Sequence, residues 1–168
     1  MRIGLAVIGA IVTALLDASV APFVSLLGQR PDFLLVTTLA VTVTIGSESG
    51  FVWAFAGGLA LDLLLAPGRP IGATVVALLL AAGIAAFVAR VAGRNHVVTT
   101  IVLTFPLALL YRLALGVLIA AVAGAGAPTD LLGGGLSLAV LDTVLVIPLA
   151  LLGRWAWVRW AAHDRVEW

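Results

Sequence analysis

Hydrophobic residues occur along this chain in long blocks, separated by short clusters of glycine, proline, serine and charged residues. A helix needs about 20 mainly apolar residues to cross about 30 Å of hydrocarbon, because it rises about 1.5 Å per residue. Six blocks can be drawn, the second of them short, and they predict spans over residues 3–27, 32–45, 50–66, 71–89, 97–122 and 131–152. The pattern therefore predicts an all-α, polytopic membrane protein with a single domain over residues 1–168 and a short tail at 153–168.

The breaks between the blocks contain typical turn and cap residues. Ser47 stands just before the third block and is expected to be its N-cap, since a serine side chain accepts hydrogen bonds from the first N–H groups of a helix. The run Pro67–Pro70 predicts a loop before the fourth block. Pro106 falls inside the fifth block and predicts a kink in that helix.

Composition agrees with the membrane prediction and excludes several classes of site. Hydrophobic residues make up 63% of the 168 residues and charged residues only 10%. No cysteine is present, which excludes disulfides and thiolate metal sites. The formal net charge of +1 gives no indication of a nucleic-acid partner.

The distribution of arginine predicts the orientation of the six spans. With the N-terminus inside, the cytoplasmic flanks hold Arg2, Arg90, Arg94, Arg154, Arg159 and Arg165. The outer loops then hold only Arg30 and Arg69. Cytoplasmic loops carry the excess of basic residues in membrane proteins, so both termini are expected to be cytoplasmic.

Four ionisable residues lie deep inside the apolar blocks, namely Asp17, Asp62, Arg112 and Asp142. A charge at membrane depth costs at least about 2.5–3.5 kcal/mol on insertion scales and is tolerated where it faces protein or water and has a partner. A guanidinium group cannot lose its proton, so Arg112 must pair with carboxylates. We expect a buried charge network in the interior. It either fixes the packing of the helices without any ligand or lines a polar cavity or proton path.

Small residues repeat at four-residue spacing beside two of these charges. Gly50, Ala54 and Gly58 precede Asp62 in the third block, and the fifth block carries a matching set. Its members are Ala108, Arg112, Gly116 and Ala120. Small residues at this spacing allow helix backbones to approach closely in lipid. These positions therefore predict helix-packing seams.

No pattern in the sequence indicates catalysis, a cofactor or a metal. Both histidines, His96 and His163, lie in the cytoplasmic flanks, where they are too far from the membrane interior for an intramembrane serine–histidine pair. The aspartates of the third and sixth blocks lack the Gly-x-Gly-Asp setting of presenilin-like proteases, and no zinc-binding or phosphate-binding motif occurs. The sequence therefore predicts a protein that is not an enzyme.

Two segments together resemble a known family. RPDFLL at Arg30–Leu35 opens the second block, and GFVWAFAGGLALDLLLAPGRPIG at Gly50–Gly72 covers the third block and the loop after it. Their Pro-Asp, Gly-Phe, Leu-Asp-Leu and closing glycine resemble the rod shape-determining protein MreD family. The resemblance implies an outer-side cluster of motif residues, formed by Pro31, Asp32, Gly68, Pro70 and Gly72. Pro67 and Pro70 make the break stiffer than the Ser/Gly-rich version that is usual in the family.

The resemblance implies a noncatalytic scaffold of the bacterial elongation machinery in the inner (plasma) membrane. Such proteins pair with the single-span protein MreC, which links MreB filaments to RodA and a class B penicillin-binding protein. The family fold is similar to the substrate-binding subunit of energy-coupling-factor vitamin transporters. A vitamin-type transporter subunit or small-solute carrier is therefore the alternative. A carrier needs a partly polar cavity of solute size, whereas a scaffold should be filled by side chains.

Overall fold

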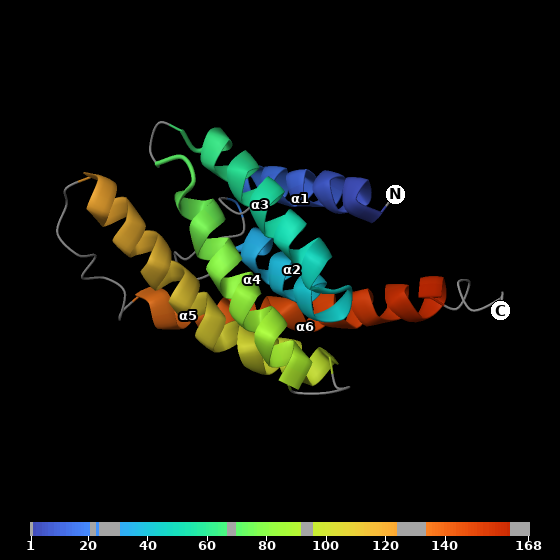
Figure 1. Ribbon diagram of the computed structural model, residues 1–168. Helices are drawn as coiled ribbons and strands as arrows, with labels where there is room; N and C mark the ends of the chain where they lie inside the picture. Colours follow the sequence, from blue (N-terminus) through green and yellow to red (C-terminus); the bar gives the residue numbers. More distant parts are fainter. Residues whose placement is uncertain are drawn as a thin grey trace.

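The computed structural model describes residues 2–20, 23, 31–66, 70–91, 96–123 and 134–161. These residues form six α-helices and, within the same ranges, no strand (Figure 1). The helices are α1 (Arg2–Ser19), α2 (Phe33–Thr44), α3 (Ser47–Leu64), α4 (Ala73–Val91), α5 (His96–Ala123) and α6 (Gly134–Ala161). The predicted all-α class is confirmed.

Helix α2 is the centre of the bundle. All five other helices pack against it, and they follow one another around it in the order α1, α3, α4, α5, α6. Most side chains of α2 are buried, including Leu34, Leu35 and Leu39, which belong to the hydrophobic core. Helices α1 and α6 both pack on α2 but hardly contact each other, so the ring of described helices is not closed between them.

The helices alternate in direction along the bundle. Helices α2, α4 and α6 begin at the same end, where α1, α3 and α5 finish (Figure 1). We call this the Asp32 end, after the N-cap residue of α2. Helix α1 begins and α6 finishes at the opposite end (Figure 1).

Two of the described helices are long and apolar enough to cross a membrane by length and composition. They cover Ala73–Val91, with a mean hydropathy of 2.3, and Val98–Val122, with a mean hydropathy of 2.1. Helix α2 has 12 residues, which corresponds to about 18 Å at about 1.5 Å per residue. It is therefore shorter than the hydrocarbon layer and packs against longer neighbours.

The structure corrects three of the expected helix boundaries. Gly46, not Ser47, is the N-cap of α3, and its φ of 135° suits glycine because it has no Cβ. Helix α1 ends at Ser19, well before the expected limit at 27. Helix α6 continues to Ala161, past the expected limit at 152, since arginine and tryptophan after the apolar block are compatible with helix.

The predicted packing seams differ in how closely they approach a neighbouring helix. A Cβ added to Gly50 would lie 2.8 Å from the Cα of Thr42 in α2, and one added to Gly58 would lie 2.9 Å from the Cα of Val75 in α4. Ala54 and Ala108 are fully buried. Gly116 is only half-buried. Two glycines of α3 therefore place this helix in backbone contact with both α2 and α4.

Candidate functional site

Arg112 in α5 and Asp142 in α6 form an ion pair inside the bundle. The Nη2 atom of Arg112 lies 2.7 Å from Oδ2 of Asp142. The Asp142 side chain is completely buried and that of Arg112 is 16% exposed. Both residues stand on apolar helices, so the pair joins α5 to α6 by a charge-assisted hydrogen bond in a low-dielectric environment.

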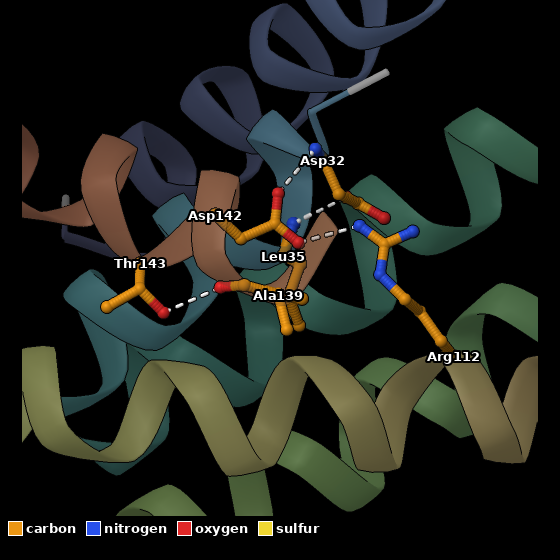
Figure 2. A network of polar contacts seen from close by, with 6 residues as sticks. All are labelled: Asp32, Leu35, Arg112, Ala139, Asp142 and Thr143. Atoms are coloured by element: carbon orange, nitrogen blue, oxygen red, sulfur yellow. Dashed lines mark hydrogen bonds and ion pairs between the residues drawn. The ribbon is translucent and has the colours of Figure 1, made fainter. Parts of the chain in front are cut away.

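The second oxygen of the Asp142 carboxyl group binds the start of α2. Its Oδ1 accepts a hydrogen bond from the backbone N–H of Asp32 at 3.0 Å (Figure 2). Asp32 is itself the N-cap of α2, because its Oδ1 accepts from the backbone N–H of Leu35 at 2.9 Å. One carboxylate therefore connects α6 to both α5 and α2, as Figure 2 shows.

Asp17 brings a third carboxyl group to the same place from α1. This carboxyl group lies close to Asp32 and to the first residues of α2. Four helices thus supply charged groups around the first turn of α2. We call the set Asp17, Asp32, Arg112 and Asp142 the α2 charge cluster.

The backbone of α2 explains why three carboxyl groups gather beside one guanidinium. The first N–H groups of a helix have no partner within the helix, and together they present a partial positive charge that favours carboxylates. Arg112 supplies the remaining positive charge, although its Nε is buried without a hydrogen-bond partner in the described part of the chain. The α2 charge cluster contains three carboxyl groups and one guanidinium, so its acidic groups outnumber its basic group.

Among the described residues, no group of three or more histidine or acidic side chains is arranged to hold a metal ion.

Asp62 lies apart from this cluster and binds the start of α4. Its fully buried carboxyl group accepts from the backbone N–H of Gly72 at 2.8 Å and from that of Thr74 at 3.2 Å. Gly72 has a φ of +96°, which residues with a Cβ rarely adopt. Asp62 was expected to share one network with Arg112, whereas its hydrogen-bond partners in the structure are backbone N–H groups at the start of α4.

Some of the family-motif residues lie at the start of α2 and others lie at the start of α4. Buried Pro31 and half-buried Asp32 belong to the start of α2, whereas Pro70 and Gly72 precede α4 beside Asp62. Both helices begin at the Asp32 end (Figure 1). Gly68 lies outside the described residues. The described hydrogen bonds attach Asp32 to Asp142 and Gly72 to Asp62.

The contact of Asp32 with the buried charges was not predicted from the sequence, although a local signal was present. An aspartate placed directly before an apolar run is a typical helix N-cap. A helix N-terminus also attracts other carboxylates. Asp17 and Asp142 could therefore have been matched to the start of α2 once Asp32 was identified as its cap.

Together the fold and the sites define a helical bundle with membrane-spanning character, in which buried aspartates attach helices to one another. Residues 1–154 match the family of the rod shape-determining protein MreD. The chain belongs to the MreD family, as the motif resemblance predicted. No curated protein and no solved structure gives a significant match to the chain. The family is one of membrane proteins, and membership suggests a role in rod shape determination.

Proposed function

We propose that this chain is a noncatalytic membrane scaffold of the bacterial cell-elongation complex. It binds an MreC-like single-span protein and helps to couple MreB filaments to peptidoglycan synthesis by RodA and a class B penicillin-binding protein. Family membership over residues 1–154 supports the role in cell shape. The protein needs no cofactor, metal or nucleic acid for this role.

The contacts of the buried aspartates support the proposal. Asp142 binds Arg112 and the backbone of Asp32, and Asp62 binds the backbone of Gly72 and Thr74. Each of these contacts joins one helix to another. Charges that hold helices together suit a rigid platform for another protein better than they suit a reaction centre.

In this proposal all six helices cross the bacterial inner membrane, and both termini are cytoplasmic. The Asp32 end then faces outward, and exposed Arg90 in the last turn of α4 lies at the cytoplasmic end. The five other helices cover most of the side chains of the short helix α2. The proposed architecture is similar to that of the substrate-binding subunits of energy-coupling-factor transporters.

A substrate-binding subunit of a vitamin-type transporter, or a small-solute carrier, is the second candidate. It is favoured by the partial exposure of the α2 charge cluster, in which Asp17 and Asp32 are half-buried and Arg112 is 16% exposed. In that case the charged groups bind a solute in addition to holding the helices.

Purification from native membranes separates the two candidates. Tagged protein is extracted in a mild detergent, and its partners are identified by mass spectrometry. A scaffold is expected to retain an MreC-like protein and to restore rod shape in cells depleted of the chromosomal copy. Recovery of an ATPase coupling module without an MreC-like protein would contradict the scaffold function and support the carrier.

A further inference from the structure

Two hairpins of the bundle, α1–α2 and α3–α4, share a sequence pattern. The pattern Leu-Asp-x-x-x-Ala-Pro occurs at Leu16–Pro22 and again at Leu61–Pro67, and at no third place in the chain. Each copy is followed by Arg-Pro, at Arg30–Pro31 and at Arg69–Pro70, and these are the only Arg-Pro pairs present. The two parts of the pattern are separated by residues 23–29 in the first copy and by residue 68 alone in the second, a difference that loops tolerate.

We propose that the two hairpins are copies of one helical unit, and that an aspartate near the end of the first helix closes each copy by binding the start of the second helix. Asp17 then does for α2 what Asp62 does for α4. This inference goes beyond the proposed function, because it concerns how the bundle is built and requires neither a partner protein nor a solute.

The pattern falls at the same place in both hairpins. Helix α1 ends two residues after Asp17, and α3 ends two residues after Asp62. Helix α2 begins two residues after Pro31, and α4 begins three residues after Pro70. Helices α1 and α3 finish at the Asp32 end, where α2 and α4 begin (Figure 1). The two hairpins therefore share their direction as well as their pattern.

An aspartate in the last turn of a helix is unfavourable within that helix. The C-terminal end carries a partial negative charge, whereas the start of a following helix offers unpaired N–H groups and a partial positive charge. The carboxyl group of Asp62 binds such a start, since it accepts from the N–H groups of Gly72 and Thr74. Asp17 lies close to the first residues of α2. The repeated aspartate thus meets the start of the next helix in both hairpins.

The two copies differ in how the N–H groups of the second helix are bound. Leu35 and Thr74 each stand four residues after the proline of their Arg-Pro pair. The N–H of Thr74 is bound by Asp62, whereas the N–H of Leu35 is bound by Asp32. The second copy has Ile71 in place of this capping aspartate. Two carboxyl groups therefore share in the first hairpin what one does in the second, so loss of the closing aspartate should open the first hairpin less.

Thiol labelling tests the two closures separately, because the natural chain contains no cysteine. Thr38→Cys in α2 and Ala77→Cys in α4 are matched reporters, since each natural residue is fully buried and stands seven residues after the proline of its Arg-Pro pair. A thiol reacts with maleimide as the thiolate, which forms where water reaches it. Detergent-solubilised protein with one reporter is labelled with N-ethylmaleimide, and the rates with and without the closing aspartate are compared.

Each aspartate should protect the reporter in its own hairpin. Asp17→Leu is expected to raise the labelling rate of Thr38→Cys about fivefold and to leave that of Ala77→Cys within about twofold. Asp62→Leu is expected to raise the rate of Ala77→Cys about thirtyfold and to change that of Thr38→Cys little. Glu48→Gln removes an exposed carboxyl group at the opposite end of the bundle and, as the control, should change neither rate.

Two results would overturn the proposal. Unchanged labelling of Thr38→Cys in the Asp17→Leu variant would mean that the first aspartate closes nothing. An equal rise at both reporters would mean that the aspartate stabilises the whole bundle and not its own hairpin.

Asparagine variants cover the case in which a leucine variant does not fold. Asp17→Asn and Asp62→Asn keep one acceptor oxygen, so a smaller rise confined to the same hairpin is expected, and an equal rise at both reporters would again overturn the proposal. The labelling needs no partner protein. Its failure therefore leaves the scaffold function standing, and failure to recover an MreC-like protein leaves the repeated hairpin standing.

Discussion

The carboxyl group of Asp62 binds the backbone N–H of Gly72 at 2.8 Å and thereby closes the connection between α3 and α4. The same group also accepts from the N–H of Thr74 in the first turn of α4. A side chain of one helix thus performs the N-cap function for the next helix. This contact gives a physical reason for the Leu-Asp-Leu and closing glycine on which the resemblance to the MreD family was based.

Removal of the Asp62 carboxyl group should destabilise the α3–α4 connection. Asp62→Leu leaves the N–H groups of half-buried Gly72 and buried Thr74 without this acceptor, which is expected to cost about 1–3 kcal/mol of unfolding free energy. Asp62→Asn keeps one side-chain oxygen and is expected to cost less. Unfolding of purified protein by a denaturing detergent measures both values, and equal stability of Asp62→Leu and the unchanged chain would refute the capping role.

Gly72 tests the backbone geometry of the same turn. A Cβ at this position meets no atom within 4 Å, so any cost of Gly72→Ala comes from its φ of +96°. We expect a loss of about 1–2 kcal/mol. Gly4→Ala is the control, because a Cβ there also meets nothing within 4 Å but the residue is in α1. The control should be neutral or slightly stabilising, and a similar loss in both variants would contradict the role of φ.

Close packing of α3 on α4 depends on Gly58. An added Cβ would lie 2.9 Å from the Cα of Val75, and this backbone atom cannot move aside as a flexible side chain can. Gly58→Ala is expected to lower the unfolding free energy by about 1–3 kcal/mol. Gly83→Ala is the matched control within α4, since its Cβ would lie 4.0 Å from the nearest neighbouring atom, in the ring of Phe51. Thermal unfolding midpoints of the two variants should differ clearly, and equal midpoints would exclude a close approach at Gly58.

The N-cap of α2 gives a fourth prediction. Asp32→Ala removes the acceptor for the N–H of Leu35 and is expected to cost about 0.5–2 kcal/mol. Asp32→Asn retains a capping oxygen and should be close to the unchanged chain in thermal stability. If both variants unfold at the same temperature as the unchanged chain, Asp32 does not stabilise α2.

Local patterns predicted the helices well, because apolar blocks and glycine or proline breaks depend on neighbouring residues alone. Pro106 and Pro148 lie inside α5 and α6, where the long apolar runs are still helical around them. Boundaries were less predictable. Gly46 is the N-cap of α3 and has no side chain to signal this role. Ser47, the more familiar type of capping residue, was therefore chosen from the sequence.

The pairing of the buried charges could be predicted only in part. An arginine in an apolar helix must find a carboxylate, but the sequence contains three candidates at depth and does not say which one lies on the facing helix. The structure selects Asp142 for Arg112, since α5 and α6 are neighbours in the ring, and leaves Asp62 to the start of α4. Backbone N–H groups at helix starts compete for carboxylates, and this competition depends on the tertiary arrangement.

The central claim is that the Arg112–Asp142 pair holds the helices of a rigid scaffold together. A double-mutant cycle on the unfolding free energy of the purified protein tests it most directly, with Arg90→Leu on the exposed end of α4 as the control. Arg112→Leu leaves a buried carboxylate unpaired and is expected to cost about 3–5 kcal/mol, whereas Arg112→Leu with Asp142→Leu should recover much of that loss. Arg90→Leu should have little effect. An Arg112→Leu variant as stable as Arg90→Leu, or a double variant whose loss equals the sum of the single losses, would contradict the claim.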